Sequence, residues 1–133
     1  MQAVKARITR GLPVGCYVPT CDNSGAKIVK IFTIMKLKTV KRRKPSGGIG
    51  DLVMCSVKSG RPEMRKQVVL AVIVRQKREF RRMDGMRIKF EDNAVVVLKD
   101  DKGNPKGTIF KGALAKEACA RWPGIAKIAS IIV

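Results

Sequence analysis

The amino-acid sequence predicts a mainly β fold, a small closed or nearly closed β-barrel that is followed by a short helical part. Short apolar runs separated by glycine-containing turns fill the first two-thirds of the chain, and this spacing is typical of small barrels. Closure would also remove exposed strand edges from so β-rich a chain. The 133 residues fit one domain, which we expect to comprise a barrel at about 12–111 and a helical part at about 112–133.

The first two expected strands form a hairpin. Residues 14–21 and 26–34 are rich in β-forming side chains, and they flank the sequence DNSG. Asx residues with glycine between two such runs favour a turn. A third strand is expected at residues 51–57, after the glycine-rich sequence PSGGIG. Residues 67–75, QVVLAVIVR, give the central strand, which is so apolar that we expect both of its faces to be covered.

The return strand is expected at residues 86–90, where MRIKF alternates apolar and basic side chains. This is the clearest two-residue periodicity in the chain. The sequence EDN then turns the chain into an apolar strand at residues 94–98, and residues 100–107 form a turn-rich hairpin tip.

The last quarter of the chain changes character. Residues 112–122 have helical periodicity, with one apolar face that comprises Leu114, Ala115, Ala118, Cys119 and Trp122. Glu117 and Arg121 are spaced i,i+4 in the favourable order, and we expect them to lie together on the outer side of this helix. Pro123 marks the helix end because it disfavours helical geometry at the preceding residue. The ending, IAKIASIIV, leaves a final helical turn or a strand open.

The charge of the chain points to a polyanionic partner. Lys and Arg total 29, Asp and Glu total 10, and the formal net charge is +19. A folded domain this basic repels itself, so we expect the charge to serve binding rather than stability. Nucleic acid is the favoured partner, and membrane surfaces and acidic proteins are less favoured alternatives. Disorder is a poor explanation because 45% of the residues are hydrophobic and lie in strand-like runs.

The sequence contains no catalytic constellation. It has no histidine, the commonest general base, and PSGGIGD matches neither a Walker loop nor a dinucleotide fingerprint. The tripeptide Glu91-Asp92-Asn93 could be an acidic or metal site, but a turn is favoured because Asx side chains cap turns between strands. We therefore predict that the protein is not an enzyme and has no catalytic residue and no cofactor.

The cysteines, Cys16, Cys21, Cys55 and Cys119, form no CxxC pair. Three lie in apolar runs, where a thiol packs as a small hydrophobe, so we expect reduced core cysteines and no bound metal. The N-terminus lacks the apolar region of a signal peptide, and no apolar run approaches the roughly 20 residues that span a bilayer. A soluble, cytoplasmic protein without a membrane partner is expected.

Basic residues gather in three segments that interrupt the strands: residues 36–44, residues 58–66 and the sequence RQKREFRRMDG at 75–85. A solvated loop would explain any one of them, but three in one small chain favour RNA binding. Arginine outnumbers lysine in the third segment, which suits bidentate contacts to phosphate oxygens. Aromatic residues are only 5%, too few to stack successive bases. We therefore expect recognition of RNA backbone and shape.

Several motifs in this order resemble one ribosomal family. AVIV at residues 71–74 is followed at the family's spacing by Asp84-Gly85, Phe90, Asn93 and Val96-Val97. The segments CDNSGAK, VKRRKPSGGIGDLV, RRMDG, FEDNAVVVL and PKGTIFKG extend the similarity over nearly the whole chain. The family is the universal L-fourteen family of the large ribosomal subunit, and GRPEMRKQVV and RWPGIAKIASIIV resemble its archaeal and eukaryotic branch. Met83 and Ala113 depart from it, since the family often has proline at both positions.

This resemblance implies a small closed five-stranded β-barrel with projecting basic hairpin loops and a short helical C-terminal part. It also implies a structural constituent of the cytoplasmic ribosome. The implied partners are large-subunit ribosomal RNA, neighbouring large-subunit proteins and, across an intersubunit bridge, small-subunit ribosomal RNA. An anti-association initiation factor is a further candidate partner.

The family's RNA-facing basic positions correspond here to Lys41, Arg42, Arg43, Arg78, Arg81, Arg82 and Lys106. Together with the charge of the three segments, they give the full predicted set of RNA-binding residues. That set is Lys36, Lys38, Lys41, Arg42, Arg43, Lys44, Arg61, Lys66, Arg75, Lys77, Arg78, Arg81, Arg82 and Lys106.

Two other classes of function stay open at this point. A small barrel enzyme or RNA-modifying factor is disfavoured by the lack of a catalytic set. A free single-strand-binding or chaperone-like barrel is disfavoured by the low aromatic content. Sedimentation of a cell extract separates these classes, because only a ribosomal constituent would be present in stoichiometric amounts with large subunits.

Overall fold

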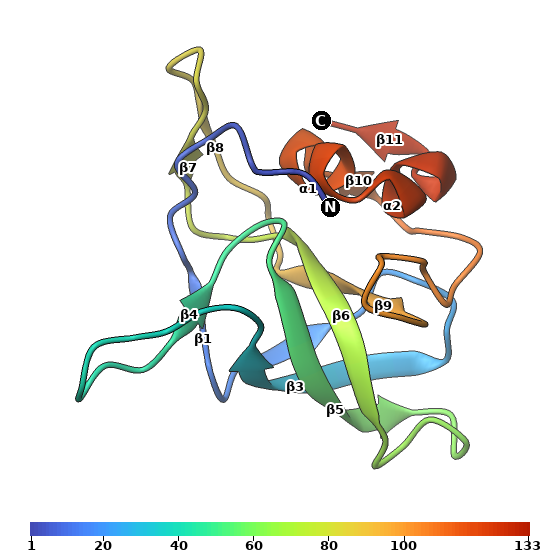
Figure 1. Cartoon of the computed structure of the whole chain (residues 1–133). Coiled ribbons are helices and arrows are strands. Elements are labelled where there is room, and N and C mark those ends of the chain that lie inside the picture. Colours follow the sequence, from blue (N-terminus) through green and yellow to red (C-terminus); the bar gives the residue numbers. More distant parts are fainter.

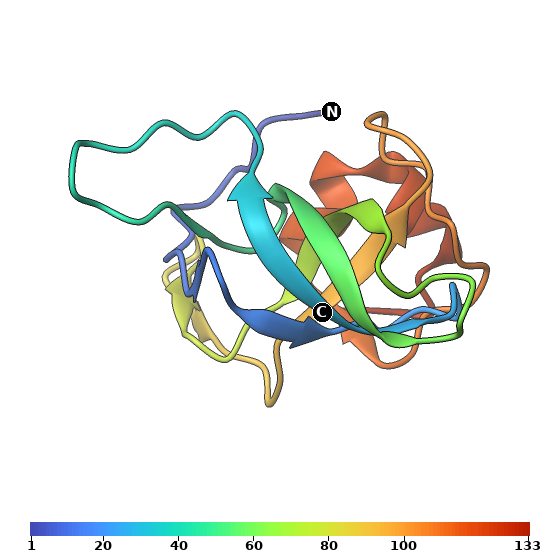
Figure 2. The ribbon, with the colours of Figure 1, turned by 90° about the horizontal axis from the view of Figure 1, so that it is seen from below.

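The computed structural model describes residues 1–133 and is built around one antiparallel five-stranded sheet (Figure 1). Its strands follow the order β2-β3-β5-β6-β9 and comprise Tyr17–Pro19, Ala26–Ile34, Leu52–Gly60, Val68–Arg75 and Ala94–Leu98, respectively. Figure 2 shows that the sheet is strongly curled. The hairpin predicted around DNSG is confirmed, with Tyr17 of β2 opposite Lys30 of β3.

Three two-stranded ladders accompany this sheet. β1 (Leu12–Pro13) pairs with β4 (Ser46–Gly47), β7 (Phe80–Arg81) pairs with β8 (Arg87–Ile88), and β10 (Ala113–Leu114) pairs in parallel with β11 (Ile131–Ile132). Two short helices, α1 (Lys116–Arg121) and α2 (Pro123–Ile128), lie close to the N-terminus (Figure 1). The amide of Gln2 donates to the carbonyl of Arg121 there (3.3 Å).

The sheet does not close into a barrel, so the prediction of a closed five-stranded barrel is wrong in this respect. Its edge strands β2 and β9 approach each other, but only one backbone bridge, between Thr20 and Val95, links them. A longer ladder is limited on the β2 side, because this strand has three residues and ends at Pro19, which has no N–H to donate. The fold is therefore a curled half-barrel whose two edges touch at one point.

A buried carboxylate supplies part of the contact that these edges lack. Asp22 is 8% exposed and accepts a hydrogen bond from the amide of Val97 on β9 (3.0 Å). Ser24 donates its hydroxyl to the other carboxylate oxygen (2.9 Å). Burial raises the pKa of the Asp22 carboxyl, although these hydrogen bonds act in the opposite direction. One side chain thus joins the two sheet edges where backbone pairing stops.

The apolar core comprises 30 buried side chains in one cluster, and its largest members include Trp122 and Phe80. In β6, residues 71–74 are fully buried, as expected of the central strand, whereas Val68 at the other end is 59% exposed. The buried half of β6 contacts α1, and its Ile73 packs closely on Gly47. The prediction that both faces of this strand are covered is therefore confirmed for its second half only.

The C-terminal part differs from the single helix predicted at residues 112–122. Gly112 has a φ of +79°, the next two residues form β10, and α1 spans only six residues. The predicted apolar face is confirmed, because its members are all buried, namely Leu114, Ala115, Ala118, Cys119 and Trp122. Residues 125–133 contain both of the structures that the sequence left open, the end of α2 and the strand β11.

The predicted contact between Glu117 and Arg121 on the outer side of this helix is wrong. Glu117 is 7% exposed and bonds Arg82 of the β7–β8 hairpin, whereas Arg121 bonds Asp51 (3.2 Å). Each side chain has a charged partner from a distant part of the chain, so Glu117 and Arg121 do not pair with each other. The side of α1 that carries Glu117 faces the protein rather than solvent.

Two strands differ in length from the prediction. The third strand continues to Gly60, so part of the basic connection at residues 58–66 belongs to β5. The return strand predicted at residues 86–90 contracts to the two residues of β8. Met86 is exposed because it lies at the tip of the hairpin, where the Arg82 amide donates to its carbonyl (2.9 Å).

Candidate nucleic-acid interface

The most basic exposed segment is the loop of residues 35–45, between β3 and β4. Figures 1 and 2 show that it extends away from the sheet, and it contains no acidic residue. Six predicted RNA-binding residues in this loop are exposed and form no ion pair, namely Lys36, Lys38, Lys41, Arg42, Arg43 and Lys44. A polyanion could therefore bind here without displacing an internal salt bridge.

A hydrogen-bonded turn gives the tip of this loop a defined shape. The amide of Arg43 donates to the carbonyl of Val40 (3.1 Å), and the hydroxyl of Thr39 donates to the carbonyl of Arg43 (3.2 Å). Arg42 has a φ of +69°, a left-handed conformation that is uncommon for residues other than glycine and occurs mainly in turns. The two adjacent arginines are thus presented by a short turn.

The basic segment of residues 75–85 leads into the β7–β8 hairpin, which projects at the top of Figure 1. The buried side chain of Phe80 anchors its base, and the amide of Met86 donates to Oδ1 of Asp84 at its tip (2.9 Å). Gly85 has a φ of +87°, which confirms the predicted Asp84-Gly85 turn, because glycine adopts this conformation without steric cost. The exposed predicted cations of the segment are Lys77, Arg78 and Arg81.

Arg75, which was predicted to bind RNA, is used inside the protein. Its side chain is 12% exposed, and its Nε atom lies 3.0 Å from the carboxylate of Asp92. Its Nη1 group donates to the carbonyls of Lys111 and Ala113 (2.9 and 3.0 Å). The guanidinium therefore ties the end of β6 to β10, and the acidic residue of the sequence EDN serves as its structural partner.

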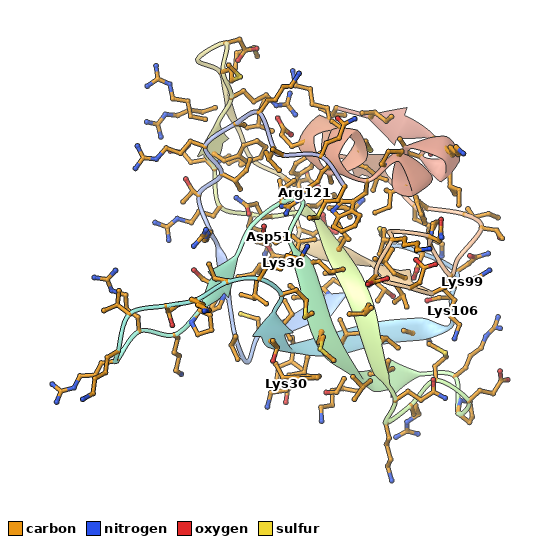
Figure 3. The ribbon with its side chains drawn as sticks, in the orientation of Figure 1. Lys30, Lys36, Asp51, Lys99, Lys106 and Arg121 are labelled. Carbon is orange, nitrogen blue, oxygen red and sulfur yellow. The ribbon has the colours of Figure 1, made fainter.

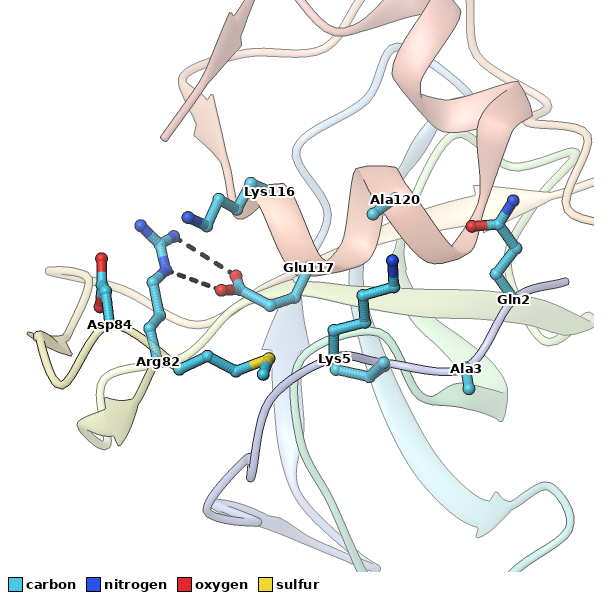
Figure 4. A pocket seen from close by; sticks show the side chains of 10 residues that line it. Gln2, Ala3, Lys5, Arg82, Asp84, Lys116, Glu117 and Ala120 are labelled. Carbon is cyan, nitrogen blue, oxygen red and sulfur yellow. Dashed lines mark hydrogen bonds and ion pairs between the residues drawn. The ribbon is translucent and has the colours of Figure 1, made fainter.

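Arg82 is also engaged inside the protein. Its Nε atom donates to Glu117 Oε1 (2.6 Å), and its Nη2 group donates to the carbonyl of Val133 (2.6 Å). The side chains of the Arg82–Glu117 pair are only 9% and 6% exposed. Figure 4 shows the pair at the edge of a pocket between the N-terminal residues 2–5, the hairpin and α1. This ion pair holds together the hairpin, the helix and the last residue of the chain.

The basic segment of residues 58–66 lies at the other end of the sheet. Arg61 and Lys66 are exposed in the connection between β5 and β6, which lies at the bottom of Figure 1, opposite the β7–β8 hairpin. Lys106, labelled in Figure 3, is also exposed, and its Nζ atom lies 3.1 Å from the sulfur of Met64 within this connection. The structure therefore distributes the basic segments around the sheet and does not bring all of them together.

The prediction missed a further basic group at the N-terminus. A backbone bridge between Arg7 and Arg81 places the N-terminal segment beside the β7–β8 hairpin, so Arg7 and Arg10 lie near Arg87. The sequence did carry a signal for this group, because the first 21 residues contain basic residues and no acidic residue.

The thiols and carboxylates offer no comparable site. All four cysteines are free, and burial raises the pKa of Cys21 and of Cys55 to about 12. Such thiols stay protonated at neutral pH and are poor nucleophiles. Histidine, cysteine, aspartate and glutamate residues form no group of three that could hold a metal ion. None of the helices has the length and apolar character needed to cross a membrane.

Comparisons with known proteins identify the family of this chain. The family described as ribosomal protein L14p/L23e matches residues 11–133. Two relatives, both named large ribosomal subunit protein uL14, come from the archaea Nanoarchaeum equitans and Picrophilus torridus and are 56% and 50% identical over 133 residues. Both matches cover 100% of this chain and 100% of the relative. The chain therefore belongs to the ribosomal protein L14p/L23e family, as its motifs predicted.

Proposed function

We propose that the protein is a structural, non-enzymatic constituent of the large ribosomal subunit and binds large-subunit ribosomal RNA through its exposed basic segments. The names of its full-length relatives support assembly into the large subunit. The observation that carries RNA binding is the loop of residues 35–45, which has six exposed cations, no acidic residue and no ion pair. The cytoplasmic ribosome is the corresponding location.

The charge of this loop suits the phosphate backbone of RNA. Closely spaced cations that neutralise phosphates release condensed counterions, and this release supplies much of the affinity of such complexes. Arg42 and Arg43 add planar forks that match pairs of phosphate oxygens, whereas the lysines act as point charges. In the free protein these charges only repel one another, so a bound polyanion would stabilise the loop.

Binding of large-subunit ribosomal RNA by the purified protein at several salt concentrations tests this proposal. We expect a steep negative slope of the logarithm of the association constant against the logarithm of salt concentration. The double variant Arg42→Ala/Arg43→Ala should make this slope less negative by about 2, or about 1 for each lost phosphate contact. Its melting temperature should hardly change, because both side chains are exposed.

The matched control is Lys99→Ala/Lys127→Ala. It removes the same charge from two exposed lysines that lie outside the proposed RNA-binding segments and form no ion pair. Its slope should equal that of the wild-type protein. A flat slope for the wild-type protein, or equal slopes for the two double variants, would contradict RNA binding through the loop.

A different surface suits a neighbouring large-subunit protein. Tyr17, Lys30, Ser56 and Val68 lie opposite one another across four strands of the sheet, and Tyr17 and Val68 are 61% and 59% exposed. Phe32 on β3 is also exposed. Exposed aromatic and aliphatic side chains favour contact with a protein rather than with phosphate groups. We assign the protein neighbour to this outer face of the sheet.

The family resemblance supports two finer expectations. One is contact with small-subunit ribosomal RNA across an intersubunit bridge, and the other is binding of an anti-association initiation factor. Sedimentation of mixed subunits tests the first of them. Large subunits that lack this protein should associate with small subunits less completely than subunits that contain it. Unchanged association would argue against a role in the bridge.

A further inference from the structure

A hollow lined by arginines lies between the N-terminal segment and the β7–β8 hairpin. Its lining contains no acidic residue. Two segments that are far apart in the sequence contribute its five arginines, Arg7, Arg10, Arg81, Arg82 and Arg87. The hollow is thus a place where the fold, rather than one run of the sequence, concentrates guanidinium groups.

Three contacts fix the N-terminal segment at this position. Its backbone pairs with the hairpin at Arg81, and the fully buried side chain of Gln76 donates to the carbonyl of Thr9 (2.8 Å). Ile8 packs so closely on Gly48 that a Cβ atom at Gly48 would lie 2.6 Å from its side chain. The arginines of this segment are therefore presented by a held backbone and not by a free terminus.

The positive charge of the hollow is only partly balanced within the protein. Arg82 and Arg87 have carboxylate partners, whereas the other three arginines form no ion pair. The Arg87–Glu79 pair joins side chains that are 64% and 53% exposed, so it contributes little. The guanidinium groups that line this hollow carry like charges and repel one another. A bound anion would reduce that repulsion.

We infer that this hollow binds phosphate groups of the RNA backbone, with Arg7, Arg10 and Arg81 holding phosphate oxygens through their planar forks. The inference rests on the RNA binding proposed above. It adds a site that uses Arg7 and Arg10 of the N-terminal segment, which the sequence did not predict to bind RNA. RNA is favoured over an acidic protein segment because successive phosphates of one RNA strand can occupy several neighbouring forks at once.

The test uses the full chain and large-subunit ribosomal RNA transcribed in vitro. The double variant Arg7→Ala/Arg10→Ala should weaken binding and make the salt slope less negative by about 2. The variant Arg7→Lys/Arg10→Lys keeps the charge but loses the forks, so it should show a partial loss. Both positions are exposed, so the melting temperatures should stay close to that of the wild-type protein.

The Lys99→Ala/Lys127→Ala variant is again the control for lost charge. If Arg42→Ala/Arg43→Ala weakens binding and the N-terminal alanine variant matches this control, the hollow is no RNA site and the proposed function stands. If the wild-type protein itself does not bind the RNA, the proposed function fails, and this inference fails with it. Polyglutamate serves as the probe for an acidic protein segment. If the N-terminal alanine variant loses polyglutamate binding but binds RNA as the wild-type protein does, the hollow binds an acidic protein instead.

Discussion

The ion pair between Arg82 and Glu117 gives a sharp test of the fold, because it joins the β7–β8 hairpin to α1. We predict that Arg82→Ala destabilises the protein, whereas replacement of the exposed Arg81 in the same hairpin does not. The variant leaves the Glu117 carboxylate, whose side chain is 6% exposed, without its charged partner. It also removes the hydrogen bond to the carbonyl of Val133 (2.6 Å).

The expected loss is large for one substitution. Removing one partner of a buried ion pair costs about 3–5 kcal/mol. We expect about 3 kcal/mol, at the lower end of that range, because the adjacent pocket lets water reach Glu117 once the arginine is gone (Figure 4). An unfolding entropy of about 2.1 cal/mol/K per residue gives about 0.28 kcal/mol/K for 133 residues. The melting temperature should therefore fall by about 10 °C.

Thermal denaturation followed by circular dichroism measures this change. Arg81→Ala is the matched control from the same hairpin, and its effect should stay within about 0.5 kcal/mol, or about 2 °C. The double variant Arg82→Met/Glu117→Leu should recover much of the loss, because no unpaired charge stays buried. Equal melting temperatures for Arg82→Ala and Arg81→Ala would refute a structural role for this ion pair.

Four further predictions concern the interior. Asp22→Ala should cost about 2 kcal/mol, because it leaves a buried amide of β9 without an acceptor, and urea denaturation measures this loss. Burial raises the pKa of Asp22 above 3.8 in the folded state, so the folded state holds this proton more tightly than the unfolded state. The stability of the wild-type protein relative to Asp22→Asn should therefore fall as the pH rises through the interval above 3.8, and a rise would contradict the burial effect. Native Cys21 and Cys55 should resist alkylation by iodoacetamide at pH 8, because their pKa is about 12; rapid modification in mass spectra would disprove their burial. Gly48→Ala should cost about 1–3 kcal/mol through overpacking against Ile8, and an unchanged melting temperature would show that the N-terminal segment is loosely held.

Local patterns in the sequence predict the strands because each strand carries its own apolar run and each turn its own polar residues. β3 and β9 have the predicted bounds, and the Asp84-Gly85 turn lies where expected. Closure of the barrel could not be predicted in this way. It depends on whether two edges that are distant in sequence meet in register. Here β2 ends at Pro19, one backbone bridge links the edges, and the Asp22 side chain bonds β9 where backbone pairing stops.

Some residues of the candidate RNA-binding site could also be predicted from local patterns, and others could not. The sequence predicts that the cations of the 35–45 loop are exposed, because a run of charged side chains is almost never buried without partners. Arg75 and Arg82 are different, since a basic residue looks the same in a sequence whether its partner is a phosphate or a distant carboxylate. The arginine hollow was missed for a similar reason, because it requires the pairing of Arg7 with Arg81.

Ultraviolet crosslinking of purified large subunits, followed by mass spectrometry of the RNA-bound peptides, tests RNA binding by the exposed basic segments most directly. We predict crosslinked nucleotides on peptides from the loop of residues 35–45 and from the β7–β8 hairpin. Crosslinks confined to α1, α2 or the outer face of the sheet would contradict the proposed interface. Absence of the protein from purified large subunits would contradict the proposed function itself.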